Sequence, residues 1–269
     1  MNKNLDKTTL DFHDDAEIYD AINNFDDDLK FWKKWCKKAG HNVLELCCGT
    51  GRVGIPLIKA GFDYYGIDIS YPFLEAATKK TVGHRGKFVF TLDDMRSFKL
   101  EKKFDSIIIP HNALAHLYSY KDLEKCFQSV LKHLKKDGLF MLSVLNPDPR
   151  FLIRDSKKRY SFTNKTLVTK SGISFTLTEN NIYDKTTQIN HIKWYYKIKG
   201  KKQEIVKDLT MRMYYPQELL ALLEYNGFEV VKSLGSFGEK PFKSDSSIQI
   251  IIAKRKKGKL RKFFQWKKS

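Results

Sequence analysis

The sequence is poor in cysteine and contains no long apolar run. Its four cysteines are Cys36, Cys47, Cys48 and Cys126, and none belongs to a Cys-x-x-Cys pair or to a Cys/His spacing typical of zinc ligands. We therefore predict neither a disulfide framework nor a metal site. No apolar stretch approaches the roughly 20 residues that a membrane-spanning helix needs. The polar residues 1–17 also lack the apolar region of a secretory signal, so we expect a cytoplasmic protein.

Acidic residues are in the minority, with 31 Asp and Glu against 49 Lys and Arg, which gives a formal net charge of +18. Such an excess can indicate binding to nucleic acid or to an anionic membrane. Most of the lysines are scattered over predicted helices, which favours a solvated surface and no nucleic-acid partner. The densest basic segment is the tail, where Leu260, Phe263 and Phe264 interrupt the charges. This tail fits either a helix on a membrane surface or, as we favour, a short polar extension.

Strand and helix patterns alternate through the first 150 residues. Apolar strands are predicted at 43–46, 64–67, 88–92, 104–109 and 139–145, with helices at 26–38, 52–60, 71–80 and 123–134. This alternation indicates βαβ units and a parallel sheet. Residues 159–214 instead show near-alternating Thr, Ile, Tyr and Phe, which is typical of an antiparallel meander. A helix at 216–225 and strands at 228–234 and 248–253 are predicted to follow it.

A glycine-rich turn joins the first predicted strand to the following helix. Its pattern is Gly49-x-Gly51-x-x-Gly54, in which the glycines let the chain turn sharply and let a ligand approach the backbone. Asp68 ends the next strand, where an acidic side chain can accept hydrogen bonds from ribose hydroxyls. These features fit a dinucleotide or S-adenosylmethionine. Glu45 lies inside the first strand and favours S-adenosylmethionine, because a cationic cofactor attracts a carboxylate whereas a pyrophosphate repels it.

Several segments together resemble the class I S-adenosylmethionine-dependent methyltransferases. Glu45-x-Cys47-x-Gly49-x-Gly51 and the strand end at 66–70 are similar to the first two motifs of this family. Cys47 departs from the pattern, since many members have glycine there. The similarity continues to about residue 146, with further matching segments at 93–98, 104–109 and 134–138.

The resemblance implies an α/β fold with S-adenosylmethionine as the cofactor. The expected fold is a Rossmann-like seven-stranded methyltransferase sheet, mostly parallel with its last strand antiparallel, into which the antiparallel β meander is inserted. Residues 1–150 form the cofactor-binding core with N-terminal helices, and 151–214 form the insertion, as a substrate lid or dimer contact. Residues 215–254 complete the core with a helix and the closing strands, and 255–269 are the basic tail.

The resemblance also implies roles for individual residues. Asp94 is expected to meet the adenine amino group, and Met95 to pack on the adenine ring. Tyr19 and His116 match positions near the methyl-transfer site and are the candidate catalytic residues. The alternatives are that Tyr19 merely covers the cofactor and that His116 caps a helix. The expected cofactor-binding residues are Tyr19, Glu45, Cys47, Gly49, Gly51, Arg52, Asp68, Ile69, Asp94, Met95, Pro110 and His111.

The expected acceptor is a small molecule that is methylated on nitrogen or oxygen. Residues 110–113 lack the Asn/Asp-Pro-Pro-aromatic sequence of enzymes that methylate the amino groups of bases. What remains resembles the bacterial small-molecule branch, the amino-sugar N-methyltransferases in particular. Arg212 and Tyr214 are candidate substrate contacts, with ordinary strand residues as the alternative. Two alternative functions stay open: a methyltransferase acting on RNA or protein, and a non-catalytic S-adenosylmethionine-binding protein. The oligomeric state also stays open between a monomer and a homodimer.

Overall fold

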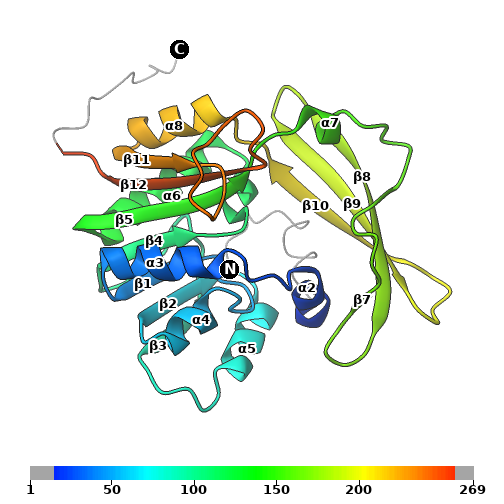
Figure 1. Cartoon of the computed structure of the whole chain (residues 1–269), viewed down its shortest axis with the longest axis horizontal. Helices are drawn as coiled ribbons and strands as arrows, with labels where there is room; N and C mark the ends of the chain where they lie inside the picture. Colours follow the sequence, from blue (N-terminus) through cyan, green and yellow to red (C-terminus); the bar gives the residue numbers. More distant parts are fainter. Residues whose placement is uncertain (1–14, 258–269) are drawn as a thin grey trace.

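The computed structural model describes residues 15–257, and its main feature is a seven-stranded sheet flanked by helices (Figure 1). The spatial order of the strands is β11-β12-β5-β4-β1-β2-β3, and β12 is antiparallel to both of its neighbours. The predicted fold class is thereby confirmed. The strands are β1 (Asn42–Leu46), β2 (Asp63–Asp68), β3 (Phe88–Leu92), β4 (Phe104–Ile109), β5 (Leu134–Leu145), β11 (Phe228–Leu234) and β12 (Ile248–Arg255).

Helices cover both faces of this sheet because its strands are apolar on both sides. On one face, α3 (Leu29–Ala39), α4 (Gly54–Lys59) and α5 (Tyr71–Lys80) pack in one apolar cluster against strand residues such as Val43 and Ile108. On the other face, α6 (Tyr120–His133) and α8 (Pro216–Tyr225) pack against Leu44 and Ile107. Neighbouring residues of one strand thus enter opposite cores, as the pleat requires.

A second, antiparallel sheet lies beside the core and supplies the predicted meander (Figure 1). Strands β8 and β9 alternate between an inward apolar face and an outward polar face, with Phe175, Leu177, Ile192 and Trp194 turned inward. The sheet is therefore half-solvated, as antiparallel sheets commonly are. Its strands are β6 (Tyr160–Ser161), β7 (Leu167–Val168), β8 (Ser174–Asp184), β9 (Ile189–Ile198) and β10 (Ile205–Arg212).

Some elements differ from the predictions. The structure contains a helix for which no bounds were predicted, α2 (Ala16–Ile22), which holds Tyr19 and which Asp15 caps through its carboxylate. The predicted strand at 139–145 begins earlier, because residues 134–138 already belong to β5, with a register irregularity opposite β4 between Phe104 and Ser106. A short helix, α7 (Pro149–Leu152), leads into the second sheet. Most of the basic tail, residues 258–269, lies outside the described residues.

The described part of the chain has no candidate membrane span and no candidate metal cluster. Within residues 15–257, no helix is long and apolar enough to cross a membrane. The same residues contain no group of three or more His, Cys, Asp or Glu side chains that could hold a metal ion. The four cysteines are all free.

Candidate active site

The carboxyl ends of β1, β2, β4 and β5 meet at one edge of the main sheet, and the second sheet faces this edge. Between them lies a cavity of about 400 Å³. One part of its wall is the glycine-rich loop with Glu45, Arg52 and Asp68, and another part comes from β9 and β10. Ligands of open α/β sheets bind at this edge of the sheet, where strand order reverses. The cavity is therefore the candidate active site.

Asp68 holds the glycine-rich loop in place. One of its carboxylate oxygens accepts a hydrogen bond from the backbone nitrogen of Gly49 at 2.7 Å, and the other accepts from Ser70 at 2.9 Å. The side chain is 7% exposed and lines the cavity. Because a carboxylate offers about four acceptor positions, Asp68 can serve the loop and still accept from a ligand diol.

Cys47 stands in the loop with a left-handed backbone conformation, at φ 58°. A residue with a β-carbon adopts this conformation at a cost of about 1–2 kcal/mol, which explains why glycine is common at this position in the family. Burial raises the pKa of the Cys47 thiol, so the thiol stays protonated. The Cys47 sulfur contacts the Met95 sulfur at 3.6 Å, and the side chain thus fills space between the loop and the segment after β3.

Glu45 is buried in β1 and reaches the cavity wall. Its carboxyl accepts a hydrogen bond from the Tyr64 hydroxyl at 2.6 Å, across the β1–β2 pair. The polar partner that a buried carboxyl requires is therefore present within the protein, and a cationic cofactor is not its only explanation. Burial raises the pKa of Glu45 to about 8, although the Tyr64 hydroxyl lowers it. At neutral pH the cofactor-free protein holds this carboxyl mainly protonated.

The raised pKa of Glu45 makes stability depend on pH. Between pH 4.5, the ordinary pKa, and about pH 8, the folded chain keeps a proton that the unfolded chain has lost. Stability contributed by this group is therefore present below pH 4.5 and falls as pH rises, by about 1.4 kcal/mol per pH unit at most. Glu45→Gln keeps an acceptor for Tyr64 and abolishes this slope. Thermal melts of the cofactor-free protein from pH 5 to 8 measure it.

A matched control for this experiment is Glu101→Gln, which neutralises an exposed acid outside the cavity. We expect this variant to follow the wild-type dependence on pH. A Glu45→Gln melting profile with the same slope as the wild type would show that Glu45 does not carry the dependence.

Arg52 lines the cavity but is already engaged. Its guanidinium donates two hydrogen bonds to the Asp28 carboxylate, at 2.7 and 2.8 Å, and lies over the Phe25 ring. Asp28 is 1% exposed and also accepts from Trp32 at 2.9 Å. This network fixes the guanidinium in one orientation. α3 itself begins at Leu29 and not at residue 26 as predicted.

Tyr19 brings α2 over the glycine-rich loop. Its ring lies 4.5 Å from the Phe73 ring, and a β-carbon at Gly49 would lie 3.7 Å from the Tyr19 hydroxyl. Asp20, the next residue, holds α2 to the core through an ion pair with Lys80 at 2.6 Å and a hydrogen bond from Thr50. Tyr19 is therefore positioned as a cover over the loop, and it lines the cavity.

The segment after β4 supplies the opposite wall. Pro110, His111 and His116 all line the cavity, and His116 is the last residue of η1 (Ala113–His116). His111 and Asn112 both have left-handed backbones, at φ 50° and 60°, a conformation that persists where the surroundings enforce it. Desolvation and the charge of Arg52 lower the pKa of His111 to about 4, so this ring is neutral and bonds to Asn23 at 2.7 Å.

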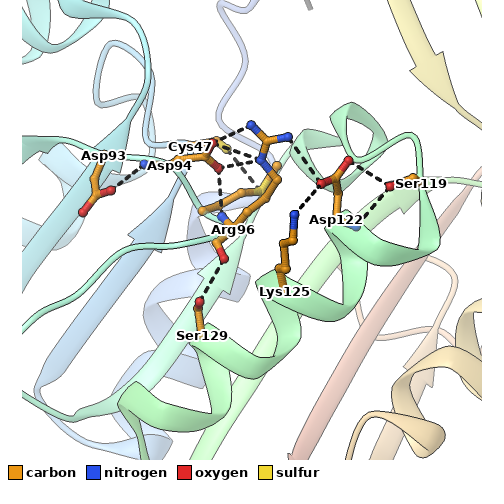
Figure 2. Close-up of polar contacts among 9 residues, drawn as sticks. Cys47, Asp93, Asp94, Arg96, Ser119, Asp122, Lys125 and Ser129 are labelled. Carbon is orange, nitrogen blue, oxygen red and sulfur yellow. Dashed lines mark hydrogen bonds and ion pairs between the residues drawn. The ribbon is translucent and has the colours of Figure 1, made fainter. Parts of the chain in front are cut away.

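Asp94 lies beyond the cavity wall and is held by Arg96. Figure 2 shows the Arg96 guanidinium against both oxygens of the Asp94 carboxylate, with Asp122 on its other side. The Arg96 Nη2–Asp94 Oδ2 distance is 2.6 Å, and the Arg96 Nη1–Asp122 Oδ1 distance is 3.5 Å. Sequence reasoning did not single out Arg96, although a residue two positions after an expected ligand is a natural candidate to orient it.

Four of the predicted cofactor residues are not among the described lining residues of this cavity: Gly51, Ile69, Asp94 and Met95. Gly51 instead packs against α4, where a β-carbon would lie 2.9 Å from the Ile55 side chain. Met95 contacts Cys47, and Ile69 follows Asp68 directly. The predicted roles of Asp94 and Met95 therefore concern the segment after β3, next to the cavity wall that Cys47 forms.

Arg212 and Tyr214, the predicted substrate contacts, are not among the described residues that line the cavity. Arg212 is 4% exposed and donates to Glu218 at 2.7 Å and to the Tyr118 carbonyl. The Tyr214 hydroxyl donates to the Leu117 carbonyl at 2.6 Å. Because side chains alternate along an extended chain, residues 209, 211 and 213 face the cavity, and 212 and 214 face the core. Both side chains thus tie the end of the second sheet to the segment after η1, and Arg212 also ties it to α8.

Sequence reasoning missed the residues of the second sheet that face the cavity. They are mostly large and apolar, together with one acid, Glu179, and they come from three strands and the segment after β6. In the sequence, most of these residues are recognisable as the apolar positions of alternating strands. The alternation shows that they share one face of the sheet, but it does not show that this face borders a cavity. These residues are Phe162, Glu179, Ile192, Trp194, Leu209, Met211 and Met213.

Comparison with known proteins agrees with this geometry. Residues 43–138 match the model of a methyltransferase domain family. The chain is 29% identical over 160 residues to YqeM of Bacillus subtilis, a protein named as a methyltransferase. This match covers 54% of this chain and 63% of YqeM, which is less than two thirds of that protein. The chain is also 28% identical over 233 residues to a glycine/sarcosine N-methyltransferase of Aphanothece halophytica, which covers 84% of this chain and 81% of the relative.

Solved structures share the fold. CalS10 of Micromonospora echinaspora, an amino pentose methyltransferase solved with S-adenosylmethionine bound, matches 88% of this chain and 94% of its own, with a TM-score of 0.66 and 16% identity. The cofactor predicted from the sequence, S-adenosylmethionine, is thus the one that this structural neighbour binds. Residues 43–138 thus match a methyltransferase domain, and the sheet order is that of the class I S-adenosylmethionine-dependent methyltransferase fold.

Proposed function

We propose that this protein transfers a methyl group from S-adenosylmethionine to a nitrogen or oxygen atom of a small-molecule acceptor. One observation carries the proposal. A single cavity is lined at one end by the glycine-rich loop and Asp68, and at the other by the inner face of the second sheet. Donor and acceptor sites that share one cavity are what a direct methyl transfer needs, because the transfer depends on alignment.

Different residues of the cavity would bind the cofactor, cover it and accept the proton. Asp68 and the Gly49 backbone would hold the ribose, and Tyr19 would cover the cofactor from α2. When bound, S-adenosylmethionine supplies a methyl group already activated by its sulfonium. The protein then aligns the acceptor and excludes water, and His116 would accept the proton that an amine or hydroxyl sheds, because imidazole is suited to proton transfer near neutral pH.

The proposed role of His116 leads to a separation of binding from transfer. In His116→Ala, we expect the affinity for S-adenosylmethionine to stay within about twofold and the methyl-transfer rate to fall roughly 100-fold, the scale of general-base catalysis. Calorimetric titration measures the first quantity, and single-turnover transfer from labelled cofactor measures the second.

His191→Ala is the matched control for this experiment, because His191 is exposed on β9 and turned away from the cavity that Ile192 lines. We expect it to leave both binding and transfer unchanged. An unchanged transfer rate in His116→Ala would remove His116 from the mechanism, and failure of the wild type to bind the cofactor would overturn the proposed function itself.

A polyanionic acceptor such as RNA is the alternative that the net charge suggests. Its binding would weaken steeply with salt, because Lys and Arg side chains release counterions from phosphates. The described residues that line the cavity include one basic side chain of this kind, Arg52, and it is paired with Asp28. The cavity therefore favours a small molecule, and acceptor binding that is insensitive to salt would agree.

A further inference from the structure

The half of the cavity that lies against the second sheet has a distinct chemistry, and we call it the acceptor chamber. Its walls carry large apolar side chains, among them Phe162, Ile192, Trp194, Met211 and Met213. Burying an apolar body here stabilises a complex by about 25 cal/mol for each Å² removed from water. A small polar acceptor would leave these walls without partners.

One carboxylate faces this chamber. Glu179 is 6% exposed and accepts a hydrogen bond from Trp194 at 2.8 Å. Arg154 pairs with it at 3.0 Å, but Arg154 is not among the described residues that line the cavity. Its guanidinium is held over the rings of Phe151 and Tyr160, at 4.3 and 4.5 Å. The cation is thus fixed outside the chamber while the acid borders it.

The described lining contains no lysine, and its one arginine, Arg52, lies at the cofactor end and is bound to Asp28. A ligand carboxylate or phosphate in the acceptor chamber would therefore be desolvated without a cation beside it, which is costly. A ligand amine, in contrast, finds groups in this chamber that stabilise a positive charge. The Glu179 carboxylate can accept from it, and the faces of aromatic rings such as Trp194 attract a cation.

Resting on the proposed function, we infer that the acceptor is an apolar amine without a carboxylate or phosphate. Its hydrophobic body occupies the acceptor chamber, and its nitrogen lies between Glu179 and the methyl donor. The amine, bound as an ammonium, first loses one proton to His116, which frees its lone pair. In the transfer, this lone pair forms the new N–CH₃ bond while the S–CH₃ bond breaks and its electron pair stays on sulfur. In this respect the chain differs from a glycine/sarcosine N-methyltransferase, whose named acceptors carry carboxylates.

The test uses the wild-type protein loaded with S-adenosylhomocysteine and three commercial probes. 2-Phenylethylamine has an apolar phenylethyl group and an amine. Phenylalanine has the same groups and a carboxylate, and glycine has the amine and the carboxylate without an apolar group. We expect 2-phenylethylamine to bind at least ~10-fold more tightly than either amino acid by calorimetry, the ratio that about 1.4 kcal/mol produces. Labelled S-adenosylmethionine should give the N-methylated amine in the same rank order.

A second arm tests the acid. Glu179→Gln should reduce the preference for 2-phenylethylamine over 2-phenylethanol, an uncharged analogue of the same shape, by about 10-fold. Asp208→Asn is the matched control, because it removes one exposed carboxylate from β10 on the outer face, where Asp208 pairs with Lys193 at 2.8 Å. This control should keep the wild-type preference. If Glu179→Gln fails to fold, the wild-type probe series alone decides.

Two outcomes overturn the inference. One is binding of phenylalanine or glycine as tight as that of 2-phenylethylamine, and the other is binding of none of the probes. In both cases the proposed function stands if S-adenosylmethionine still binds the wild type in a titration without acceptor. Failure of that titration instead overturns the proposed function, so the two failures are distinguishable.

Discussion

In Asp68→Ala, binding of S-adenosylmethionine is expected to weaken about 100-fold or more. The ribose of the cofactor would lose a charged acceptor, and each hydrogen bond to a charged group contributes about 1.5–3 kcal/mol. The loop loses its anchor as well, because Asp68 accepts from the backbone of Gly49 at 2.7 Å and of Ser70 at 2.9 Å. Calorimetric titration of the purified variant, after a melt that checks its folding, measures the loss.

Asp63→Ala is the matched control for Asp68→Ala. Asp63 begins the same strand, β2, and so lies at the sheet edge opposite to the cavity. We expect this variant to bind the cofactor like the wild type. If Asp68→Ala also bound within threefold of the wild type, the ribose site would not be at the end of β2, and the assignment of the cofactor end of the cavity would fail.

The fold was predictable because its signals are local. Each parallel strand is a short apolar run, each following helix has a helical period, and the glycine-rich loop joins the first pair. Right-handed crossovers then leave few sheet orders to consider. The one helix before α3 that the structure describes, α2, was missed because its seven residues carry no buried side chain. Tertiary contacts such as Asp20–Lys80 hold it, and these are not visible along the chain.

The candidate site was predictable where it depends on backbone turns and not where it depends on strand faces. Asp68 and Gly49 follow from their places at a strand end and in a loop. Arg212 was expected at the substrate, whereas its neighbour Met211 lines the cavity. A shift of one residue along a strand exchanges its two faces. Both faces are buried at 209–212, so the hydrophobic pattern could not decide between them.

Glu45 shows the same limit in another form. The sequence identified a buried carboxyl that needs a partner, but the partner is Tyr64 on the neighbouring strand. That contact depends on the β1–β2 register, in which Glu45 lies opposite Gly66. Register is set by packing and not by any local motif. The position of Tyr64 also explains why the third residue of the glycine pattern, Gly54, lacks a side chain, because a β-carbon there would collide with the Tyr64 ring.

Gly54→Ala is expected to destabilise the protein by about 2–5 kcal/mol, the sum of an overpacked core and a broken buried hydrogen bond. A β-carbon at Gly54 would lie 2.3 Å from the Tyr64 hydroxyl oxygen and 2.4 Å from its ring carbon. The Tyr64 ring would have to move, and Glu45, 3% exposed, would lose the hydroxyl that it accepts from at 2.6 Å. For a chain of this size the melting temperature should fall by roughly 5–15 °C.

Gly238→Ala is the matched control for the added methyl group, because a β-carbon there would make only an ordinary contact, 3.6 Å from the Ser236 hydroxyl. It should melt within about 2 °C of the wild type, as a surface substitution does. A small effect of Gly54→Ala would mean that α4 can move away from β2 at no cost, and Glu45 would then keep its partner. A large effect accompanied by loss of cofactor binding would instead show that one packing contact, helix to strand, sets both the stability of the core and the shape of the cavity wall that Glu45 forms.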